Sequence, residues 1–363
     1  MTIALLVMGA WPTTRDHLRA GSLLVRASGG TGWLASLYDT PITVENALLT
    51  SPHGTFRARI YRPSDGRARQ GLILAHGVHY MGIDEPRLIP FARQLARTGL
   101  VVMTPELAAL ADYRVENSSV DELRAAARDL SQRSFVRGGG VGLMGLSFAG
   151  GLALLAASDP TMHGVINRLV VIGGHNDLYR VSRFLATDEL ETPTGVRHMH
   201  AHDYGLIVYF YAHAEQFVAA DQLEIFRDAL RLMLHHDRLT AERAAAGLHD
   251  EARVLFNQID RNDKRALAPL VLRTIVTLRS EMAAVSPAGH MDAIRGIPVF
   301  ILHGANDDVM PPTEPAANAR ELESHADVHL LITPAMKHVT FEGEASWRER
   351  FRILHTMAGV LGS

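Results

Sequence analysis

Ser147 lies between glycines in the stretch Val141-Gly-Leu-Met-Gly-Leu-Ser-Phe-Ala-Gly-Gly151. An apolar run typical of a strand precedes this serine, and an alanine- and leucine-rich run typical of a helix follows it. A sharp strand-to-helix turn lifts a serine hydroxyl out of the fold, where it can act as a nucleophile. Gly145 and Gly150 leave room for such a turn, although Ala149 stands where the GxSxG pattern has its second glycine. The pattern predicts a nucleophile elbow, with a plain packing turn as the alternative.

A hydroxyl is a weak nucleophile at neutral pH, so Ser147 needs a base and an acid from elsewhere in the chain. Two later segments each follow an expected strand: His303-Gly-Ala-Asn-Asp-Asp-Val-Met-Pro-Pro312 and Thr333-Pro-Ala-Met-Lys-His338. An imidazole can take the serine proton and pass it to a leaving group, and a carboxylate can orient that imidazole and stabilise its cation. The chain order therefore favours His338 as the base and Asp307 as the acid.

Strands and helices are expected to alternate around these segments. Strands are predicted at 42–49, 55–61, 71–75, 100–103, 141–146, 169–172, 297–302 and 328–332, the first two as an antiparallel pair. Helices are predicted at 84–99, from 119, at 148–157, at 314–323 and from about 345, with Asp84 as the cap of the first and Ser119 and Glu122 as a capping box for the second. This alternation implies a parallel sheet covered by helices on both faces.

Residues 176–295 interrupt the alternation. Apolar residues keep helical spacing there, as in Leu223, Phe226, Leu230 and Met233, and further helices are expected over 248–259 and 267–282. An insertion between strands lies at the carboxyl edge of the sheet, where open α/β folds bind ligands. We therefore predict a helical or irregular lead-in at 1–38, an α/β core at 39–175 and 296–363, and a helical cap at 176–295.

The elbow and the order of serine, aspartate and histidine resemble the α/β-hydrolases, in style closest to their dienelactone hydrolase-like and esterase branches. The resemblance covers about 42–175 and 296–361. It implies an α/β-hydrolase fold, with a mostly parallel central sheet flanked by helices and an α-helical cap inserted between late strands. It also favours Asp307 as the acid, because this residue lies three positions after Gly304 and just before Val309 and Pro311. Asp308 and Asp177 remain alternatives.

A tetrahedral intermediate needs two preorganised donors for its oxygen. One is expected from the backbone N–H of Phe148, directly after the nucleophile. The resemblance implies the N–H of Val78 as the second, because His76-Gly77-Val78 matches a loop of the family. Tyr80 is a candidate for substrate contact, through its hydroxyl or as a pocket wall. His76 is a further candidate, although the resemblance implies that its imidazole braces the loop.

Together these residues predict a serine hydrolase that cleaves a carboxylic ester through an acyl-enzyme. The preference for an ester follows from the resemblance alone. A peptidase, lactonase or thioesterase with the same triad is the alternative within this chemistry. A non-catalytic binding protein on the same fold is the alternative of a different class. Haloalkane dehalogenases and epoxide hydrolases are disfavoured, because they place an aspartate where Ser147 stands.

The composition limits the possible partners. With 36 basic and 39 acidic residues, the chain has no excess charge for binding nucleic acid, and it contains no cysteine. No glycine-rich phosphate loop is present, so no cofactor is expected. The apolar amino terminus is too short to span a bilayer and has no basic leader, which favours a cytoplasmic protein. An amino-terminal helix that packs or touches a membrane is still possible, and the oligomeric state is open.

Two groups of polar residues in the insertion suggest rival sites. His198-Met-His-Ala-His-Asp203 places imidazoles at alternate positions, so on a strand His198, His200 and His202 would share a face and hold a divalent metal. A polar surface or pocket stretch is the simpler interpretation, and no metal is predicted. Arg180, Arg183 and Arg197 are candidates for binding a substrate carboxylate, with paired surface arginines as the simpler alternative.

Overall fold

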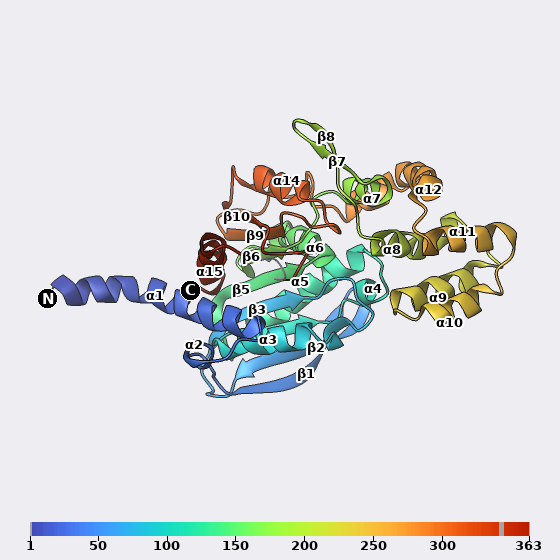
Figure 1. Ribbon diagram of the computed structural model, residues 1–363. Helices are drawn as coiled ribbons and strands as arrows, with labels where there is room; N and C mark the ends of the chain where they lie inside the picture. Colours follow the sequence, from blue (N-terminus) through green and yellow to red (C-terminus); the bar gives the residue numbers. More distant parts are fainter. Residues whose placement is uncertain (1, 341–344, 363) are drawn as a thin grey trace.

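A mostly parallel sheet of eight strands forms the centre of the protein (Figure 1). The computed structural model describes residues 2–340 and 345–362. The strand order is β1-β2-β4-β3-β5-β6-β9-β10, and only β2 pairs antiparallel, with β1 and with β4. The strands are β1 (Ile42–Ser51), β2 (Gly54–Pro63), β3 (Arg69–Ala75), β4 (Val101–Pro105), β5 (Val136–Leu146), β6 (Ile166–Ile172), β9 (Pro298–Gly304) and β10 (Asp327–Thr333). All eight predicted strands are present, and the predicted α/β-hydrolase fold class is confirmed.

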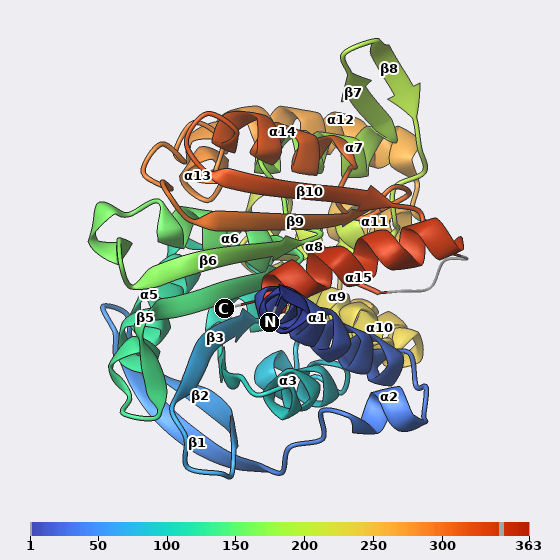
Figure 2. The same ribbon diagram turned by 90° about the vertical axis from the view of Figure 1, so that its left-hand side faces the viewer.

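Helices cover both faces of the sheet (Figure 2). One face packs against α5 (Asn117–Gln132), α6 (Phe148–Ala157) and α14 (Thr313–Leu322), and the other against α1 (Thr2–Ala27), α3 (Leu88–Arg97) and α15 (Trp347–Leu361). Neighbouring strand residues alternate between the two cores: Ile73 belongs to the first, and Leu72 and Leu74 belong to the second. This is the period of two expected for a strand that is buried on both faces. The short helices α2 (Trp33–Ser36) and α4 (Ala108–Ala111) lie in connections.

The predicted cap at Asp84 is wrong. Helix α3 begins at Leu88, and its first N–H groups are satisfied by Glu85, whose carboxylate accepts from the N–H of Leu88 at 2.7 Å. Asp84 instead accepts a hydrogen bond of 2.6 Å from Arg59 on β2. Arg59 on the neighbouring strand competes with the helix for this carboxylate. The residues next to Asp84 in the sequence do not show that contact.

The predicted capping box at Ser119 and Glu122 is also wrong. Helix α5 begins two residues earlier, at Asn117, so both residues lie inside it and both are buried. Their Oγ and Oε2 atoms have no hydrogen-bond partner among the described residues. Burial raises the pKa of Glu122 to about 7, and the nearby acids Glu106, Glu116 and Asp121 add to this effect.

This buried carboxyl predicts a pH-dependent stability. The folded-state pKa of Glu122 lies above its unfolded value, so its stabilising effect is complete below about pH 4.5 and is lost as the pH rises through about 7. Glu122→Gln removes the ionisation, and the free energy of unfolding should then exceed that of the wild type at pH 8 by up to about 3 kcal/mol. Chemical denaturation at pH 5 and pH 8 measures the difference. An identical pH dependence in both proteins would contradict the assignment.

The chain between β6 and β9 forms an insertion beside the sheet, at the right of Figure 1. Its elements are α7 (Leu178–Thr187), β7 (Glu189–Thr192), β8 (Gly195–His198), α8 (Tyr204–Ala212), α9 (Leu223–Leu234), α10 (Arg238–Ala245), α11 (Asp250–Asp260), α12 (Lys264–Thr277) and α13 (Arg279–Ala284). Its helices share an apolar core of their own. The hairpin β7-β8 was not predicted, because its four-residue strands are too short to show a period. In the described part of the chain, no helix has the length and hydropathy needed to cross a membrane.

Candidate active site

Ser147 occupies the turn between β5 and α6 in a strained conformation, with φ 56° and ψ −133°. Its N–H donates to the carbonyl of Ile172 on the neighbouring strand, at 2.8 Å. Glycine is required at 145, because a Cβ there would lie 2.3 Å from the carbonyl oxygen of Ala149. Ala149 itself is fully buried in the core, so the turn accommodates its methyl group. The local sequence folds here as the elbow pattern predicts.

A chain of hydrogen bonds joins Ser147 to two residues from later loops. Nε2 of His338 lies 2.8 Å from Oγ of Ser147, and Nδ1 of His338 lies 2.9 Å from Oδ2 of Asp307. The loops follow β9 and β10, which run parallel to β5, so all three side chains meet at the carboxyl edge of the sheet. The strand order thus brings together residues that lie far apart in the sequence.

Asp307 is fully buried and is held by several hydrogen bonds. Its Oδ1 accepts from the N–H groups of Val309 and Met310, at 2.9 Å and 2.8 Å. Burial favours the neutral acid, but His338, the neighbouring His303 and the N–H of Met310 outweigh it and lower the pKa of Asp307 below its ordinary value. Asp307 is therefore a carboxylate at neutral pH, and it can stabilise a positive charge on His338.

The two alternative acids lie elsewhere. Asp308 faces Lys337 at 3.4 Å. Asp177 caps α7 by accepting from the N–H of Tyr179 at 2.9 Å. Neither carboxylate contacts His338 within the described residues. The geometry thus favours Asp307 over both.

The loop after β3 lies against the elbow. A Cβ on Gly77 would approach Cβ of Ser147 to 3.0 Å, so glycine allows this close contact. The N–H of the next residue, Val78, has no acceptor among the described residues. Phe148 is the first residue of α6, so its N–H has no carbonyl partner inside the helix. Both N–H groups are therefore available to an oxygen bound near Ser147.

His76 braces this loop and does not line the cavity. It is buried; its Nε2 accepts from the N–H of Leu107 at 3.0 Å, and its Nδ1 lies 2.8 Å from the carbonyl oxygen of Gly77. Burial lowers the pKa of His76 to about 4, so the imidazole is neutral. The structure therefore does not place His76 where it could contact a substrate. Tyr80, in contrast, lines the cavity, and its ring packs 4.1 Å from the ring of His235 in the insertion.

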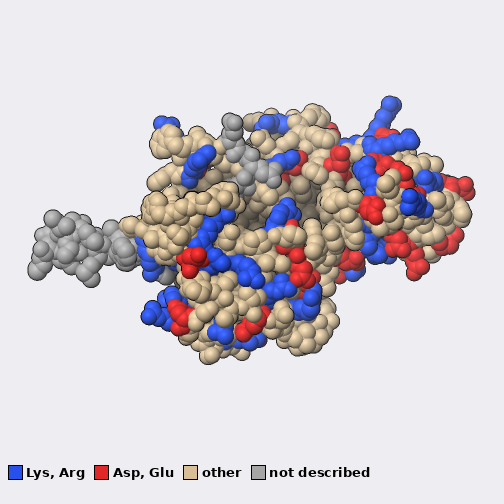
Figure 3. Space-filling model, turned by 60° about the horizontal axis from the view of Figure 1, so that its bottom comes forward, with Lys and Arg blue, Asp and Glu red and all other residues tan. Residues whose placement is uncertain are grey.

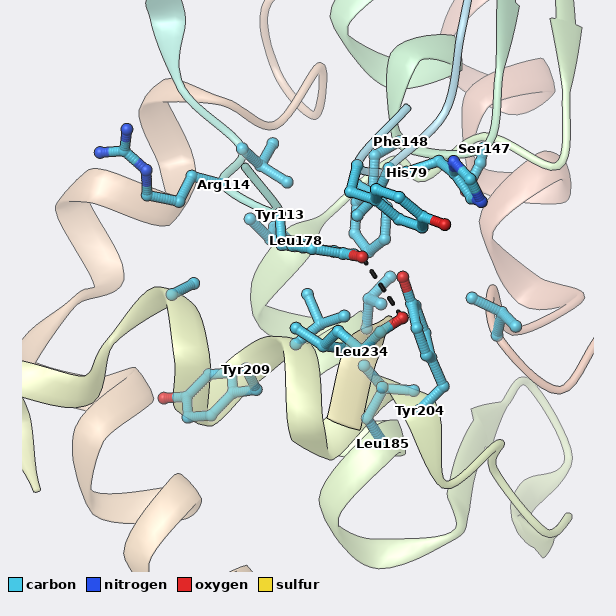
Figure 4. A pocket seen from close by; sticks show the side chains of 18 of the residues that line it. His79, Tyr113, Arg114, Ser147, Phe148, Leu178, Leu185, Tyr204, Tyr209 and Leu234 are labelled. Carbon is cyan, nitrogen blue, oxygen red and sulfur yellow. Dashed lines mark hydrogen bonds between the residues drawn. The ribbon is translucent and has the colours of Figure 1, made fainter. Parts of the chain in front are cut away.

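A cavity of about 900 Å³ opens at Ser147 and extends into the insertion. Ser147, Phe148 and His338 lie in its wall, together with Val78 and residues of α7, α8, α9 and α13. Figure 4 shows tyrosine hydroxyls from separate elements meeting inside it. Tyr113, Tyr204 and the carbonyl of Leu234 were not singled out from the sequence. Their proximity depends on how the insertion docks on the core, which no local pattern encodes.

The histidine run does not form a metal site. His198 ends β8, while His200 and His202 lie beyond the strand, so the three do not share a strand face. His200 lies 3.5 Å from Asp203 and 3.7 Å from Asp188. No group of three metal-ligating side chains was found among residues that the structure describes.

The arginines of the insertion do not reach the cavity either. Arg180 binds the buried carboxylate of Glu314 at 2.9 Å, and Arg183 binds Glu189 at 3.0 Å. Arg197 lies on the exposed strand β8. None of the three lines the cavity, which contradicts a role in binding a substrate carboxylate. On the face shown in Figure 3, basic and acidic side chains are interspersed, without a large surface of one sign.

The arrangement defines the class of fold: a serine elbow after β5 of a mostly parallel sheet, in the manner of the α/β-hydrolases. No protein-family model and no curated protein sequence matches the chain. Similar solved structures include a hyperthermophilic esterase from the archaeon Pyrobaculum calidifontis, 16% identical over 96% of this chain and 88% of that one, with a TM-score of 0.48.

Two further similar structures differ from each other in the share of their own length that the match covers. A thermostable carboxylesterase cloned from a metagenomic library is 14% identical over 96% of this chain and 95% of that one, with a TM-score of 0.49. The acylaminoacyl peptidase of Pyrococcus horikoshii is 11% identical over 90% of this chain but 42% of that one, with a TM-score of 0.45. At these values, nothing about the substrate of this chain follows from those enzymes.

Proposed function

We propose that this protein is a serine hydrolase that cleaves a carboxylic ester through an acyl-enzyme. The observation that carries the proposal is the hydrogen-bonded chain from Ser147 through His338 to Asp307, with distances of 2.8 Å and 2.9 Å. A base within hydrogen-bond distance activates a serine hydroxyl, and a carboxylate behind that base orients it. The strained elbow of Ser147 supports the proposal, because strain of this kind gathers at functional sites.

In the proposed mechanism, Oγ of Ser147 attacks the ester carbonyl while Nε2 of His338 takes its proton. Asp307 stabilises the resulting imidazolium. The carbonyl oxygen, now negative, faces the N–H groups of Phe148 and Val78. When the intermediate collapses, His338 returns the proton to the leaving alcohol and an acyl-enzyme remains. Water then attacks the acyl carbon and gives a proton to His338. When the bond from that carbon to Oγ of Ser147 breaks, His338 returns the proton to Oγ, the acid leaves and the free enzyme is regenerated.

The insertion acts in this proposal as a cap that surrounds the part of the substrate away from the reacting carbonyl. The proposed division is a lead-in at 1–38, a core at 39–175 and 296–363, and a cap at 176–295. Tyr80 contributes a wall where the core meets the cap. No cofactor enters the mechanism, because proton transfer and nucleophilic attack use only side chains and backbone N–H groups of this chain.

The choice of an ester over an amide, lactone or thioester rests on the family resemblance, and the choice between the dienelactone hydrolase-like and esterase branches stays a prediction. A panel of short- and long-chain nitrophenyl esters, a lactone, a thioester and aminoacyl amides would rank these substrates. Equal or faster turnover of the amides would indicate a peptidase instead of an esterase.

A fluorophosphonate probe tests the chemistry itself. We expect the probe to label Ser147 in the wild type, because it reacts with an activated serine hydroxyl. His338→Ala should slow labelling by roughly 10³-fold or more, because the base is gone. Mass spectrometry identifies the modified residue, and Ser147→Ala is the control for labelling elsewhere. A wild-type protein that folds but is not labelled would favour the non-catalytic binding protein.

A further inference from the structure

The cavity beside Ser147 has room for a body much larger than an acetyl group. Its volume of about 900 Å³ lies near the upper end of the range of roughly 300–1,000 Å³ that is usual for small-molecule sites. The insertion contributes an apolar part of the cavity wall, formed by Leu178, Val181, Leu185, Val208, Met282 and Val285. Such a wall favours a bulky apolar body on the substrate.

The charged residues of the cavity wall leave no arginine for an anionic group. Each arginine that lines the cavity has a carboxylate partner, and the pairs are Arg87 with Glu85, Arg114 with Glu116, and Arg227 with Glu215. The carboxylates offset the charge of these arginines, so the three pairs present no net positive charge to an acidic substrate body. The pairing of these arginines therefore favours a neutral body over an acidic one.

Tyr113, Tyr204 and the carbonyl of Leu234 form a polar spot in the wall of this cavity. Figure 4 shows the hydroxyl of Tyr113 pointing at the carbonyl oxygen of Leu234, with the hydroxyl of Tyr204 beside them. The three residues come from the α4-α5 connection, the end of α9 and the start of α8. The rings of Tyr113 and Tyr204 pack edge to face, with centroids 6.3 Å apart, which fixes both hydroxyls.

The carbonyl of Leu234 lacks a good hydrogen-bond partner. Leu234 ends α9, so its carbonyl has no donor from a following turn of the helix. Its one partner among the described residues is the Tyr113 hydroxyl, at 3.4 Å, which is long for a bond between two oxygens. Because a carbonyl oxygen can only accept, the partner that would complete this spot is a hydrogen-bond donor.

The backbone of Tyr113 is held in an unfavourable conformation to place this side chain. It follows the end of α4 with φ 58°, where glycine is usually preferred and a bulky residue is rare. The hydrogen bond of 2.8 Å from the N–H of Arg114 to the carbonyl of Ala109 closes this helix end. Tyr113 is nearly fully buried, with 2% of its surface exposed. The strain is thus tolerated at the position that brings a hydroxyl to the polar spot.

We propose that the cavity binds a neutral ester whose bulky apolar body carries a hydroxyl or N–H group, and that this group donates to the carbonyl of Leu234 beside the hydroxyls of Tyr113 and Tyr204. This proposal depends on the proposed function only for the ester bond of the substrate. A substrate hydroxyl fits the spot best, because it donates to the carbonyl while its oxygen accepts from a tyrosine.

Matched aryl esters test the proposal. Nitrophenyl esters of ω-arylalkanoic acids, with graded chain lengths and a phenyl, para-hydroxyphenyl or para-methoxyphenyl end, are compared by kcat/KM, and the same aryl groups are placed on the alcohol side in a second series. At the length that reaches the spot, we expect the hydroxyl to raise kcat/KM roughly 3- to 10-fold over phenyl. The methoxy group, which cannot donate, should give no gain.

Phenylalanine variants then locate the effect. Tyr113→Phe and Tyr204→Phe should each reduce the ratio of hydroxyphenyl to phenyl rates toward one. Tyr209→Phe is the matched control, because the Tyr209 side chain lines the same cavity while its hydroxyl points away from the other two in Figure 4. It should keep the ratio. No hydroxyl preference at any length, an equal gain from methoxy, or an unchanged ratio in both test variants would overturn the proposal.

Binding to a catalytically inactive protein separates this proposal from the proposed function. Ketone analogues of the same aryl series bind without being cleaved, and calorimetry with Ser147→Ala measures their affinity. A hydroxyl preference in this assay, without labelling of the wild type by the fluorophosphonate, would support the polar spot and reject the hydrolase. Labelling of Ser147 without any hydroxyl preference would support the hydrolase and reject the polar spot.

Discussion

Asp307→Asn is expected to lower kcat by roughly 10³- to 10⁴-fold on any ester that the wild type cleaves. The geometry explains the size of this effect. Oδ1 of Asp307 accepts from the N–H groups of Val309 and Met310, so the amide oxygen of asparagine would keep that place. The amide N–H₂ would then face Nδ1 of His338, which can pair with it only as an acceptor. The ring proton would move to Nε2, and His338 could no longer take a proton from Ser147.

Asp308→Asn is the matched control for this experiment, because it makes the same chemical change one residue later. Asp308 pairs with Lys337 and does not contact His338, so its loss should change kcat by less than about threefold. Asp177→Asn is expected to affect stability through the cap of α7 and to leave the proton relay in place. Steady-state kinetics on the three purified variants, with circular dichroism as a check of folding, decides between the acids. A large loss in Asp308→Asn or Asp177→Asn, with activity kept in Asp307→Asn, would reject the assignment.

Gly145→Ala is expected to have the largest effect on the fold around Ser147. The added Cβ would lie 2.3 Å from the carbonyl oxygen of Ala149, 2.6 Å from its carbonyl carbon and 2.7 Å from Cα of Gly150. All three atoms belong to the backbone of α6, so no side-chain rotation relieves the overlap. We expect the free energy of unfolding to fall by about 3 kcal/mol, because overpacking of this kind displaces the backbone. Labelling of Ser147 by the fluorophosphonate should be lost as the turn opens.

Gly138→Ala provides the comparison within the same strand. Gly138 lies at the exposed start of β5, and a Cβ there would have no heavy atom within 4 Å. The free energy of unfolding should stay within about 0.5 kcal/mol of the wild type. Urea denaturation and labelling kinetics measure both variants. Normal labelling in a stable Gly145→Ala protein would mean that the elbow does not depend on the tight contact described above.

The strands could be read from the sequence because their signal is local. Each strand shows as a short apolar run between turn residues, and all eight were predicted within five residues of their observed bounds, β5 being the one that begins five residues earlier. The starts of helices are harder to predict, because a side chain that could cap a helix can bind a residue of another element instead. Asp84 bonds to Arg59 on a neighbouring strand, and Glu122 is buried within its helix. Neither outcome depends on adjacent residues alone.

The residues of the candidate site also differ in how they were predicted from the sequence. Ser147 follows from the elbow pattern, while Asp307 and His338 follow from chain order and a family resemblance. Whether the acid is Asp307 or its neighbour Asp308 depends on the direction in which a loop turns its side chains. In the structure, the N–H groups of Val309 and Met310 hold Asp307 inward, and Asp308 lies toward Lys337.

By itself, the sequence determined a parallel sheet covered by helices, the elbow at Ser147 and the presence of a largely helical insertion, because periodicity and glycine placement act over neighbouring residues. The α/β-hydrolase fold was predicted from the family resemblance. The tertiary structure decided which carboxylate meets His338, how the arginines of the insertion are paired, and where Tyr113, Tyr204 and the carbonyl of Leu234 converge. These contacts join elements far apart in the chain, and they depend on the docking of the insertion on the sheet. The pocket that would select a substrate is therefore a property of the folded chain, while its proposed nucleophile is already visible in a short stretch of sequence.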